Sequence, residues 1–532
     1  MFTALALVGC GGNSDAPVTP RLEFSTLKGQ VNLSSVTPTS VSAYAAARFL
    51  EQASWGPTPQ AIEEVQRLGI EGWLDRQLAT PPSVLNAPGF VINHDSNNPA
   101  ESDLARIWRD RALIDLGISG PDQLRQRVSW AIFNYIPITG SQPYGDITYF
   151  NALQSHALGS YKSLLKAVTL HPAMGQFLNN NQNTADQPNE NFARELMQLF
   201  SVGLVLLNAD GTVKRDSSGK AIETYTQIDV REATRALSGW HHNYDPDLPT
   251  SNGGNFGKPM IPRTWPSNAH DAGQKQLLGQ TIRANQSIDK DLDQVLDILV
   301  SHPNTGPFVA TRLIQHLVAS DPSPSYVSRV AQVFARTNGD LKQTVRAVLL
   351  DPDARNSDVL GRQTPRTGRM KDQLLFSTGT LRALGCRAVP MVSHWDNAVR
   401  PVTGRESPPS VFGFFSPFHR APESLVLAPE QRLLGRSEIN SRGWLLSNLE
   451  RSREGFVQAG CEVALFEQAA NESDESLLTL VNNRFFRGSM PPPIQRGGRD
   501  LLATELADKS SSQKTSGLLE ALLLTPSFGV VK

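Results

Sequence analysis

From Val41 onward, apolar side chains recur three and four positions apart in almost every segment of the chain. The first such segment ends at Gly56, and Thr58-Pro59 then supplies an N-cap and a proline at the first helical position. The same spacing returns in segments 122–136, 160–170, 290–301 and 324–337. Because this is the period of an amphipathic helix, the pattern predicts a mainly α fold, a large multi-helical domain that buries its apolar stripes.

Several of these segments end alike, in a run of aliphatic residues followed by one polar residue and a proline. The endings are LKAVTLHP (165–172), LDILVSHP (296–303), VRAVLLDP (345–352) and LEALLLTP (519–526). Proline pushes the residue before it out of helical geometry, so each ending predicts a buried helix that stops at a fixed point.

One segment departs from the helical period. Leu204–Leu207 is a short apolar run, Asp210-Gly211 is a turn signal, and apolar residues alternate around Val213. This pattern predicts one small β-hairpin near 204–225, placed as an excursion between two helices.

The length of 532 residues exceeds what one hydrophobic core usually serves. We therefore expect the helical domain over 42–530 to have two lobes, with one large domain and satellite packing layers as the alternative. The loop-rich segment 353–368 is the predicted boundary between the two lobes.

The charge balance excludes one class of partner. Lys plus Arg (50) only balance Asp plus Glu (51). A nucleic-acid-binding protein would be expected to carry a basic surplus or a basic stripe. The sequence thus predicts no nucleic-acid partner.

The first ten residues are apolar and end in LVGC, whose last residue is Cys10; this resembles the lipobox of bacterial lipoproteins, where the cysteine is lipidated. No Lys or Arg precedes Cys10, so the signal is truncated and we expect the true start upstream of Met1. The Ser/Thr/Pro-rich segment 11–41 is typical of a tether. We expect an exported protein with a lipid anchor, in the outer membrane because Gly11 rather than aspartate follows the cysteine. A short apolar end without a targeting role is the alternative.

Lipidation of Cys10 would leave Cys386 and Cys461 as a pair. In an oxidising compartment a disulfide between such a pair is possible. Two free buried thiols are the alternative.

A polar cluster opens the predicted helix in PNENFARELMQLFSVG (188–203), where Asn189 fits the N-cap and Gly203 the position past the end. At 100° per residue the polar side chains share one arc of about 140°. They are Glu190, Asn191, Arg194, Glu195 and Gln198. Periodicity alone describes a helix face in water, and a face buried against other segments is the alternative.

Two further groups carry titratable side chains. Thr226 and Asp229 form a capping-box-like pair, and Asp229 projects beside an apolar face, so it is either a cap or a partly buried acid. His270-Asp271 lie in a glycine-containing loop and are a candidate acid/base pair or metal ligands.

The spacing of the histidines and cysteines assigns no metal site, because the sequence holds no His-Glu-x-x-His, no Cys-x-x-Cys and no close His-x-His pair. A nucleophile elbow, a phosphate loop and a dinucleotide fingerprint are also missing from the sequence. We predict no cofactor and no assigned metal ligand; a divalent metal held by residues from distant segments stays open.

A series of motifs follows one another in an order that resembles the bacterial domain-of-unknown-function 1800 family (DUF1800). They include ARFLEQASWGPTPQAIEEVQRLGIEGWLDRQL, LRQRVSWA, NENFARELMQLFSVGL, YTQIDVREATRALSGW, HDAGQKQLLG and PPSVFGFFSP, and the resemblance runs from about Ala45 to the C-terminus. Members of that family are typically exported, large and mostly helical. Their genes often neighbour those of an exported family related to sulfatases and phosphatases, which implies a protein of that kind as a partner.

The resemblance implies no activity, but it gives weight to positions that match the family's recurring motifs. A helix face in water would not be expected to recur, so the resemblance favours a buried structural polar network. Its members are Asn189, Glu190, Asn191, Arg194, Asp229 and Trp240. Burial would require Arg194 and the glutamates to be paired, because unpaired buried charges are costly.

Two functions fit these observations. The first is a non-catalytic or accessory envelope lipoprotein, a helical scaffold that binds a partner protein or a surface glycan. Loop aromatics offer it a contact surface, unless they pack in the core: Trp265, Trp395, Phe412, Phe414 and Phe415. The second is a hydrolase of an extracellular polymer or ester, with Glu195, His270 and Asp271 converging as a catalytic site. We favour the first, because the second lacks a recognised constellation.

Overall fold

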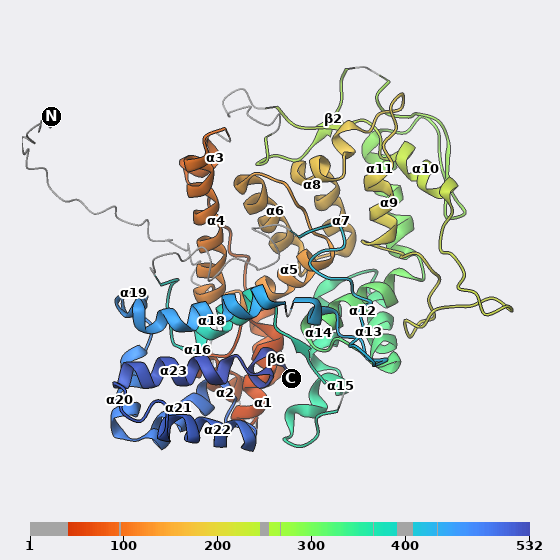
Figure 1. Cartoon of the computed structure of the whole chain (residues 1–532). Helices are drawn as coiled ribbons and strands as arrows, with labels where there is room; N and C mark the ends of the chain where they lie inside the picture. Colours follow the sequence, from red (N-terminus) through yellow and green to blue (C-terminus); the bar gives the residue numbers. More distant parts are fainter. Residues whose placement is uncertain are drawn as a thin grey trace, which may run out of the picture. The chain divides into compact units, whose positions relative to one another are not determined.

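The structure is a computed structural model that describes residues 41–94, 97–244, 255–265, 268–364, 367–390, 408–433 and 435–532. Across these residues α-helices dominate and the strands form only two-stranded sheets, so the predicted mainly α fold is confirmed (Figure 1). Cys10, almost all of the predicted tether and Trp395 lie outside the described residues. No described helix combines the length and the apolar content that crossing a membrane requires.

Most of the described chain up to residue 358 is built from helices. They are α1 (Ala43–Ala53), α2 (Pro59–Ala79), α3 (Gly89–Ile92), α4 (Pro99–Ser119), α5 (Gln123–Tyr135), α6 (Pro143–His156), α7 (Tyr161–Leu170), α8 (Pro172–Phe177), η1 (Asn180–Gln182), α9 (Asn191–Gln198), α10 (Gln227–Ala236), α11 (Ile288–Ser301), α12 (Thr305–Leu317), α13 (Pro324–Arg336), α14 (Leu341–Leu350), α15 (Pro352–Arg355) and η2 (Asn356–Asp358).

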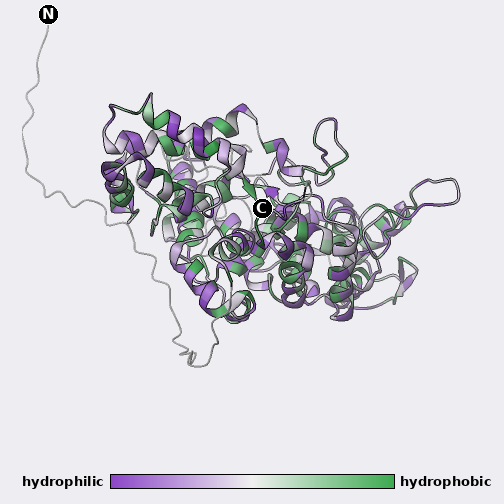
Figure 2. Cartoon of the chain, turned by 90° about the horizontal axis from the view of Figure 1, so that it is seen from below, coloured by the Kyte–Doolittle hydropathy of each residue, from purple (hydrophilic) through white to green (hydrophobic). Residues whose placement is uncertain are grey.

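The C-terminal part is helical as well. Its helices are α16 (Gln373–Ala383), η3 (Pro429–Leu433), α18 (Arg436–Arg451), α19 (Arg453–Gln458), α20 (Val463–Glu472), α21 (Asp474–Phe485), α22 (Pro492–Ala503), α23 (Ser511–Leu523) and α24 (Pro526–Gly529). Figure 2 shows hydrophilic and hydrophobic residues mixed along individual helices, as amphipathic helices require.

The strands pair antiparallel in three small sheets. β1 (Trp240–His241) pairs with β2 (Ile261–Pro262), β3 (Lys275–Leu277) with β4 (Gln280–Ile282), and β5 (Arg369–Met370) with β6 (Val530–Val531). The last of these sheets fixes the described C-terminal end of the chain beside the segment that enters α16.

Local signals set the helix boundaries. Thr58 caps α2 by accepting a hydrogen bond from the backbone N–H of Ala61, with Pro59 in the first turn, as predicted. The aliphatic-polar-proline endings also stop their helices: α7 ends at Leu170, α11 at Ser301, α14 at Leu350 and α23 at Leu523. After α7, the polar residue His171 in turn caps α8, because its Nδ1 accepts from the N–H of Ala173 at 3.2 Å.

The segment 204–224 forms the predicted β excursion, with one more turn than the sequence predicted. Bridges pair Leu207 with Val213 across the Asp210-Gly211 turn, and Arg215 with Ala221 across a second turn. Three backbone N–H groups then close a ring: Leu206 donates to Ile222 at 2.8 Å, Ile222 to Lys214 at 3.1 Å, and Lys214 to Leu206 at 2.8 Å. Each of the three extended pieces therefore pairs with both others.

The hydrophobic interior falls into two clusters. One is built from residues between Ala46 and Ala354, and the other mainly from residues between Leu374 and Phe528. The predicted lobe boundary at 353–368 lies at the break between them. It stays a prediction, because residues 37–532 form one compact unit.

Helix α5 takes part in both clusters. Val128 and Ile132 belong to the first cluster, Trp130 belongs to the second, and Phe133 packs against both. The apolar side chains of α5 therefore cover more than one face of the helix, which is typical of a buried helix.

A disulfide joins Cys386 to Cys461 inside the second cluster. Backbone hydrogen bonds flank it on both sides: the N–H of Arg387 donates to Ala459, and the N–H of Glu462 donates to Leu384. The cross-link thus ties the end of α16 to the turn between α19 and α20.

Candidate functional site

Helix α9 begins the polar cluster that the sequence singled out. The Asn189 side chain accepts from the N–H of Asn191 at 3.1 Å and so caps the first turn. Arg194 donates to Glu190 at 2.8 Å, one turn away. The side chains of Arg194 and Glu190 are 38% and 31% exposed, so this face is half in water rather than buried.

The polar face of α9 is tied to the start of α10. Gln227 donates to both carboxylate oxygens of Glu190, at 3.0 and 2.8 Å, and accepts from Arg194 at 3.1 Å. Asp229 completes the predicted capping box with Thr226, and its other oxygen accepts from the N–H of Leu278 at 2.9 Å. Burial raises the pKa of Asp229, but these hydrogen bonds outweigh it and hold the pKa below its usual value.

Trp240 does not join this network. Its ring lies in the first hydrophobic cluster, 1% exposed, and the indole Nε1 has no hydrogen-bond partner among the described residues. The prediction that Trp240 belongs to the polar network is therefore wrong, because its side chain makes no hydrogen bond with the described members of that network. An indole is large enough to be buried for its apolar area alone.

Glu195 differs from its neighbours on α9. One carboxylate oxygen, Oε2, is buried without a hydrogen-bond partner in the described part of the chain, and burial raises the pKa of the group against the opposing effect of Arg194. Tyr225 lies within electrostatic reach, and its buried hydroxyl likewise has no partner among those residues. Burial and the charge of Glu195 raise the pKa of Tyr225 to about 12.

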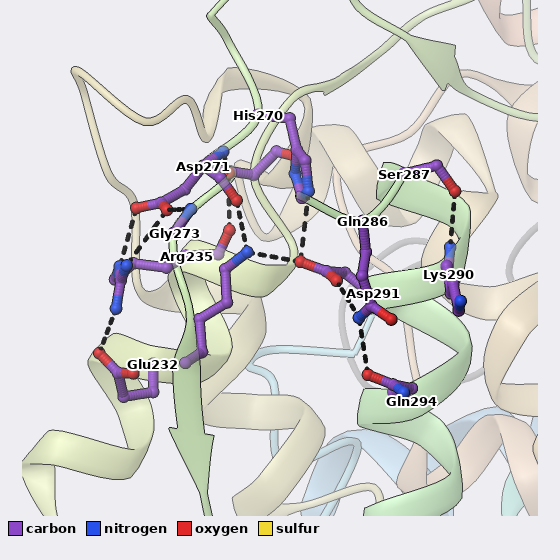
Figure 3. Close-up of polar contacts among 12 residues, drawn as sticks. Glu232, Arg235, His270, Asp271, Gly273, Gln286, Ser287, Lys290, Asp291 and Gln294 are labelled. Carbon is purple, nitrogen blue, oxygen red and sulfur yellow. Dashed lines mark hydrogen bonds and ion pairs between the residues drawn. The ribbon is translucent and has the colours of Figure 1, made fainter. Parts of the chain in front are cut away.

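His270 and Asp271 lie in a separate, densely bonded cluster (Figure 3). Asp271 accepts two hydrogen bonds from the guanidinium of Arg235, at 2.8 and 3.1 Å, and a third from the N–H of Gly273 at 2.8 Å. Arg235 also binds Glu232 at 2.8 Å. Burial raises the pKa of Asp271, but the bonds from Arg235 and Gly273 prevail and lower it, so the carboxylate is held as an anion.

On the other side of the loop, His270 faces a buried ion pair. Lys275 and Asp291 are each 1% exposed and lie 2.5 Å apart, and Gln286 donates to the second oxygen of Asp291 at 2.9 Å. His270 Nε2 lies 3.3 Å from Asp291 Oδ2 but is poorly aligned for a hydrogen bond. Although burial raises the pKa of Asp291, the neighbouring His270 and Lys275 lower it below its usual value.

The SGW motif (238–240) and the HDAG motif (270–273) lie in direct contact because a glycine leaves room for the approach. The Ser238 carbonyl accepts from His270 Nδ1, and the Ser238 Oγ accepts from the N–H of Asp271, both at 2.9 Å. Gly239 has φ +94°, and a Cβ there would stand only 3.0 to 3.1 Å from the backbone and Cβ of His270. Only glycine lets the two segments approach this closely.

The predicted catalytic residues thus form two groups. No hydrogen bond or ion pair joins Glu195 to His270 or Asp271 in the part of the chain that the structure describes. Within the same residues, no group of three or more His, Cys, Asp and Glu side chains is placed to hold a metal ion.

A pocket that the sequence did not reveal lies beside α5. Its walls are mainly aromatic and aliphatic. It is lined by Trp55, Arg109, Asp110, Leu113, Ile114, Trp130, Phe133, Ile138, Asp146, Phe150, Leu374 and Phe414. Apolar, aromatic walls with a few polar groups are typical of small-molecule sites.

The two indole rings of the pocket are held in place by their N–H groups. Trp55 donates to Gln126 and Trp130 to Asp372, both at 3.1 Å. Trp130 stacks on Phe133, with ring centroids 5.5 Å apart and planes 12° from parallel. With both N–H groups bonded to the protein, the two rings contribute only apolar atoms to the pocket wall.

The polar part of the lining comes from α4 and α6. Arg109 donates to Asp110 at 2.8 Å and to Asp146 at 2.5 Å. Two carboxylates beside this one guanidinium give the edge of the pocket several acceptor oxygens.

The PPSVFGFFSP segment supplies part of the pocket wall through Phe414. Gly413, with φ +77°, lies against α5 so closely that a Cβ would come within 2.3 Å of the Asn134 carbonyl oxygen. This contact places the Phe414 ring 6.0 Å from that of Trp130. Of the described loop aromatics, Phe414 therefore lines a pocket, whereas Trp265 is 83% exposed.

Three separate motifs of the sequence meet in this pocket: SWG through Trp55, VSWA through Trp130, and VFGFF through Phe414. Taken singly, each is typical of core packing, because an aromatic residue at helical spacing usually packs in the core. Their meeting in one pocket cannot be read from spacing.

A comparison with protein-family models matches residues 48–530 to the model described as "Protein of unknown function (DUF1800)". No curated protein and no solved structure matches the chain.

Proposed function

The chain belongs to the DUF1800 family, whose function is unknown, and from that premise we propose that it is an exported, lipid-anchored binding protein of the cell envelope with the aromatic pocket as its ligand site. The observation that carries the proposal is the convergence of Trp55, Trp130 and Phe414 on one pocket. These residues come from three distant motifs, and large concave sites with aromatic walls and a few polar groups are the usual form of a ligand site.

The ligand class that we propose is the sugar ring of a surface glycan. Aromatic faces receive the apolar C–H face of a sugar, while Asp110 and Asp146 are acceptors for hydroxyl groups at one edge. Arg109 already neutralises part of that edge, which favours a neutral polyol over a strongly charged ligand.

Export and anchoring rest on other observations. The LVGC sequence ending at Cys10 and the following Ser/Thr/Pro-rich segment support a lipid anchor, with the outer membrane as its location. The disulfide between Cys386 and Cys461 supports an oxidising compartment, because thiols are kept reduced in the cytoplasm. An exported protein related to sulfatases or phosphatases is the partner we propose.

Binding of envelope glycans tests the ligand site. We expect Phe414→Ala and Phe150→Ala to weaken binding by about tenfold, since each removes a ring from the pocket wall. Trp265→Ala, which removes an exposed ring outside the pocket, is the matched control and should leave affinity unchanged. Calorimetric titration measures both. Loss of binding in Trp265→Ala with retention in the other two would place the contact surface outside the pocket.

Lipid labelling tests the anchor. Cells grown with radioactive palmitate should label the wild-type protein and not the Cys10→Ser variant, and the variant should leave the membrane fraction. Equal labelling of both proteins would refute lipidation at Cys10.

A hydrolase is the second candidate, favoured by one observation. The buried Oε2 of Glu195, unpartnered among the described residues, and the raised pKa of that group suit a carboxyl group that donates a proton. In this version Glu195→Gln abolishes hydrolysis of an extracellular polymer or ester, whereas Glu190→Gln on the same helix does not. Full activity in Glu195→Gln would remove Glu195 from the mechanism.

A further inference from the structure

Arg312 on α12 is a buried cation without a carboxylate. It is 5% exposed, and no ion pair involves it in the part of the chain that the structure describes. The guanidinium donates one hydrogen bond, from Nη1 to Gln315 Oε1 at 3.0 Å. It lies 4.9 Å from the ring centre of Phe308 and 5.1 Å from that of Phe418.

This guanidinium borders a second pocket, on the side of α5 that faces α12. The pocket is small, and its walls come from α5, α12, the end of α9 and the VFGFFSP segment. It is lined by Asn134, Tyr135, Leu199, Arg312, His316, Val411, Phe412, Phe415 and Pro417. Gln315 fixes the segment over it by donating to the Pro417 carbonyl at 3.3 Å.

The other polar side chains of this pocket are neutral. Burial, together with Arg369, Arg312 and Arg127, holds the pKa of His316 far below its usual value, so the ring is uncharged at neutral pH. Burial raises the pKa of Tyr135, whose hydroxyl therefore stays protonated. His316 Nδ1 is buried without a hydrogen-bond partner among the described residues.

The neighbouring charges do not compensate Arg312. Near His316 there are two further buried arginines, Arg127 and Arg369, and two buried carboxylates, Asp372 and Glu430. Arg369 lies 3.3 Å from Glu430 and 3.8 Å from Asp372, and both carboxylates also act on Arg127. Among the described residues, these three cations against two anions leave one positive charge, and Arg312 is the cation on which no described carboxylate acts.

The aromatic contacts do not balance this charge. The two cation–π contacts and the single hydrogen bond offset only part of the cost of taking the guanidinium out of water. A cation that remains buried at such a cost indicates an anion that binds there. We propose that this pocket binds the carboxylate of a small organic acid, with Arg312 as the cation that pairs with it.

Charge and shape select a carboxylate among anions. The uncompensated charge is a single positive one, which matches a monoanion; a phosphate dianion would need a second free cation. The planar guanidinium offers two parallel N–H donors to a carboxylate. Leu199, Val411 and Pro417 provide apolar walls for the organic remainder of the acid.

The site is distinct from the proposed glycan pocket. Phe133 lines one pocket and Asn134 the other, so adjacent residues of α5 separate them, and the two pockets share no lining residue. Loss of glycan binding would therefore leave this proposal intact.

Titration of the full chain with sodium acetate, butyrate and benzoate tests the proposal, against sodium chloride and sodium phosphate at equal ionic strength. We expect saturable binding of at least one monocarboxylate, and a melting temperature raised by about 3 °C at ~100 times its Kd. Arg312→Met should weaken binding at least about tenfold, because it removes a charged hydrogen bond. Arg453→Met, which removes a surface arginine bound to Glu467, is the matched control and should bind normally.

The stability of the unliganded protein distinguishes an anion-binding role of Arg312 from a purely structural one. Arg312→Met removes an uncompensated charge, so the unliganded variant should melt at or above the wild-type temperature. Leu199→Phe narrows the pocket without touching the charge and should also abolish binding. The proposal is overturned if none of the three acids binds saturably, if Arg312→Met or Leu199→Phe binds them as wild type does, or if phosphate binds more tightly.

Discussion

The loop around His270 and the pocket around Arg312 both hold buried charges, yet they differ in how those charges are compensated. Near His270, Lys275 meets Asp291 at 2.5 Å and Asp271 accepts three hydrogen bonds. Near Arg312, the guanidinium has one hydrogen bond and no carboxylate among the described residues. Both regions hold several charged residues, but in the first the charges meet partners, whereas in the second Arg312 meets no described carboxylate.

This contrast shows why density of charged residues is a weak guide to a ligand site. Side chains that satisfy one another stabilise the fold and leave little binding capacity for a ligand. A buried group that lacks its partner is costly to the fold, so its persistence calls for another explanation. On this criterion the Arg312 pocket and Glu195 are better candidates than His270 and Asp271.

The largest effect on stability should come from breaking the buried ion pair between Lys275 and Asp291. Asp291→Ala would leave Lys275 as a buried, unpaired cation, and we expect a loss of about 3–5 kcal/mol in the free energy of unfolding, measured by urea denaturation. The double variant Lys275→Met/Asp291→Leu should recover most of that loss, because neither charge remains. A loss below about 1 kcal/mol for Asp291→Ala would erase the distinction between the two regions.

Acid should act next on the buried histidine of the Arg312 pocket. The pKa of folded His316 is far below 6.5, so below pH 6.5 the unfolded chain binds a proton that the folded chain does not, and stability falls as pH decreases. His316→Gln should flatten the dependence of the free energy of unfolding on pH between pH 6.5 and 4 by up to about 1.4 kcal/mol per pH unit. Equal slopes for His316→Gln and the wild type would contradict this account of His316.

A smaller effect is expected at Glu195, the exception on the polar face of α9. Its pKa is raised in the folded state, so ionisation costs stability at high pH and costs nothing below about pH 4. Glu195→Gln should therefore stabilise the fold by about 0.5–1 kcal/mol at pH 8, and the gain should vanish at pH 4. Denaturation at the two pH values measures it, and a destabilised variant at pH 8 would show that the carboxylate is favourably bound.

The smallest effect should be seen at Arg194. Its pair with Glu190 is half exposed, and such pairs contribute about 0.2–0.5 kcal/mol. We expect Arg194→Ala to change the free energy of unfolding by no more than that, and the change should be smaller still at high salt. A loss above about 1 kcal/mol would mean that this face is a structural network after all.

Local order could be predicted from the sequence because its causes are local. The Thr58-Pro59 start of α2, the stop of α7 before His171-Pro172 and the capping box of α10 each depend on residues a few positions apart. The second turn of the β excursion was missed, although Ser218-Gly219 repeats the Asp210-Gly211 signal eight residues later.

The sites could not be predicted, because they depend on which groups lack a partner. Arg312 occupies an ordinary position in an amphipathic helix, and only the packing of α5 and the VFGFFSP segment around it reveals the missing carboxylate. In the same way, nothing in the sequence links His270 to Asp291, twenty-one positions away. Charge pairing across the fold is a tertiary property, which periodicity does not encode.

The disulfide has a consequence for the VFGFFSP segment that lines both pockets. Cys386 and Cys461 are 75 positions apart and enclose that segment, so this part of the pocket walls belongs to a covalently closed ring of chain. Closing such a ring removes conformations that the segment could otherwise visit. Reducing agents should therefore weaken ligand affinity at both pockets, because the segment in their walls regains conformational entropy when the disulfide is opened.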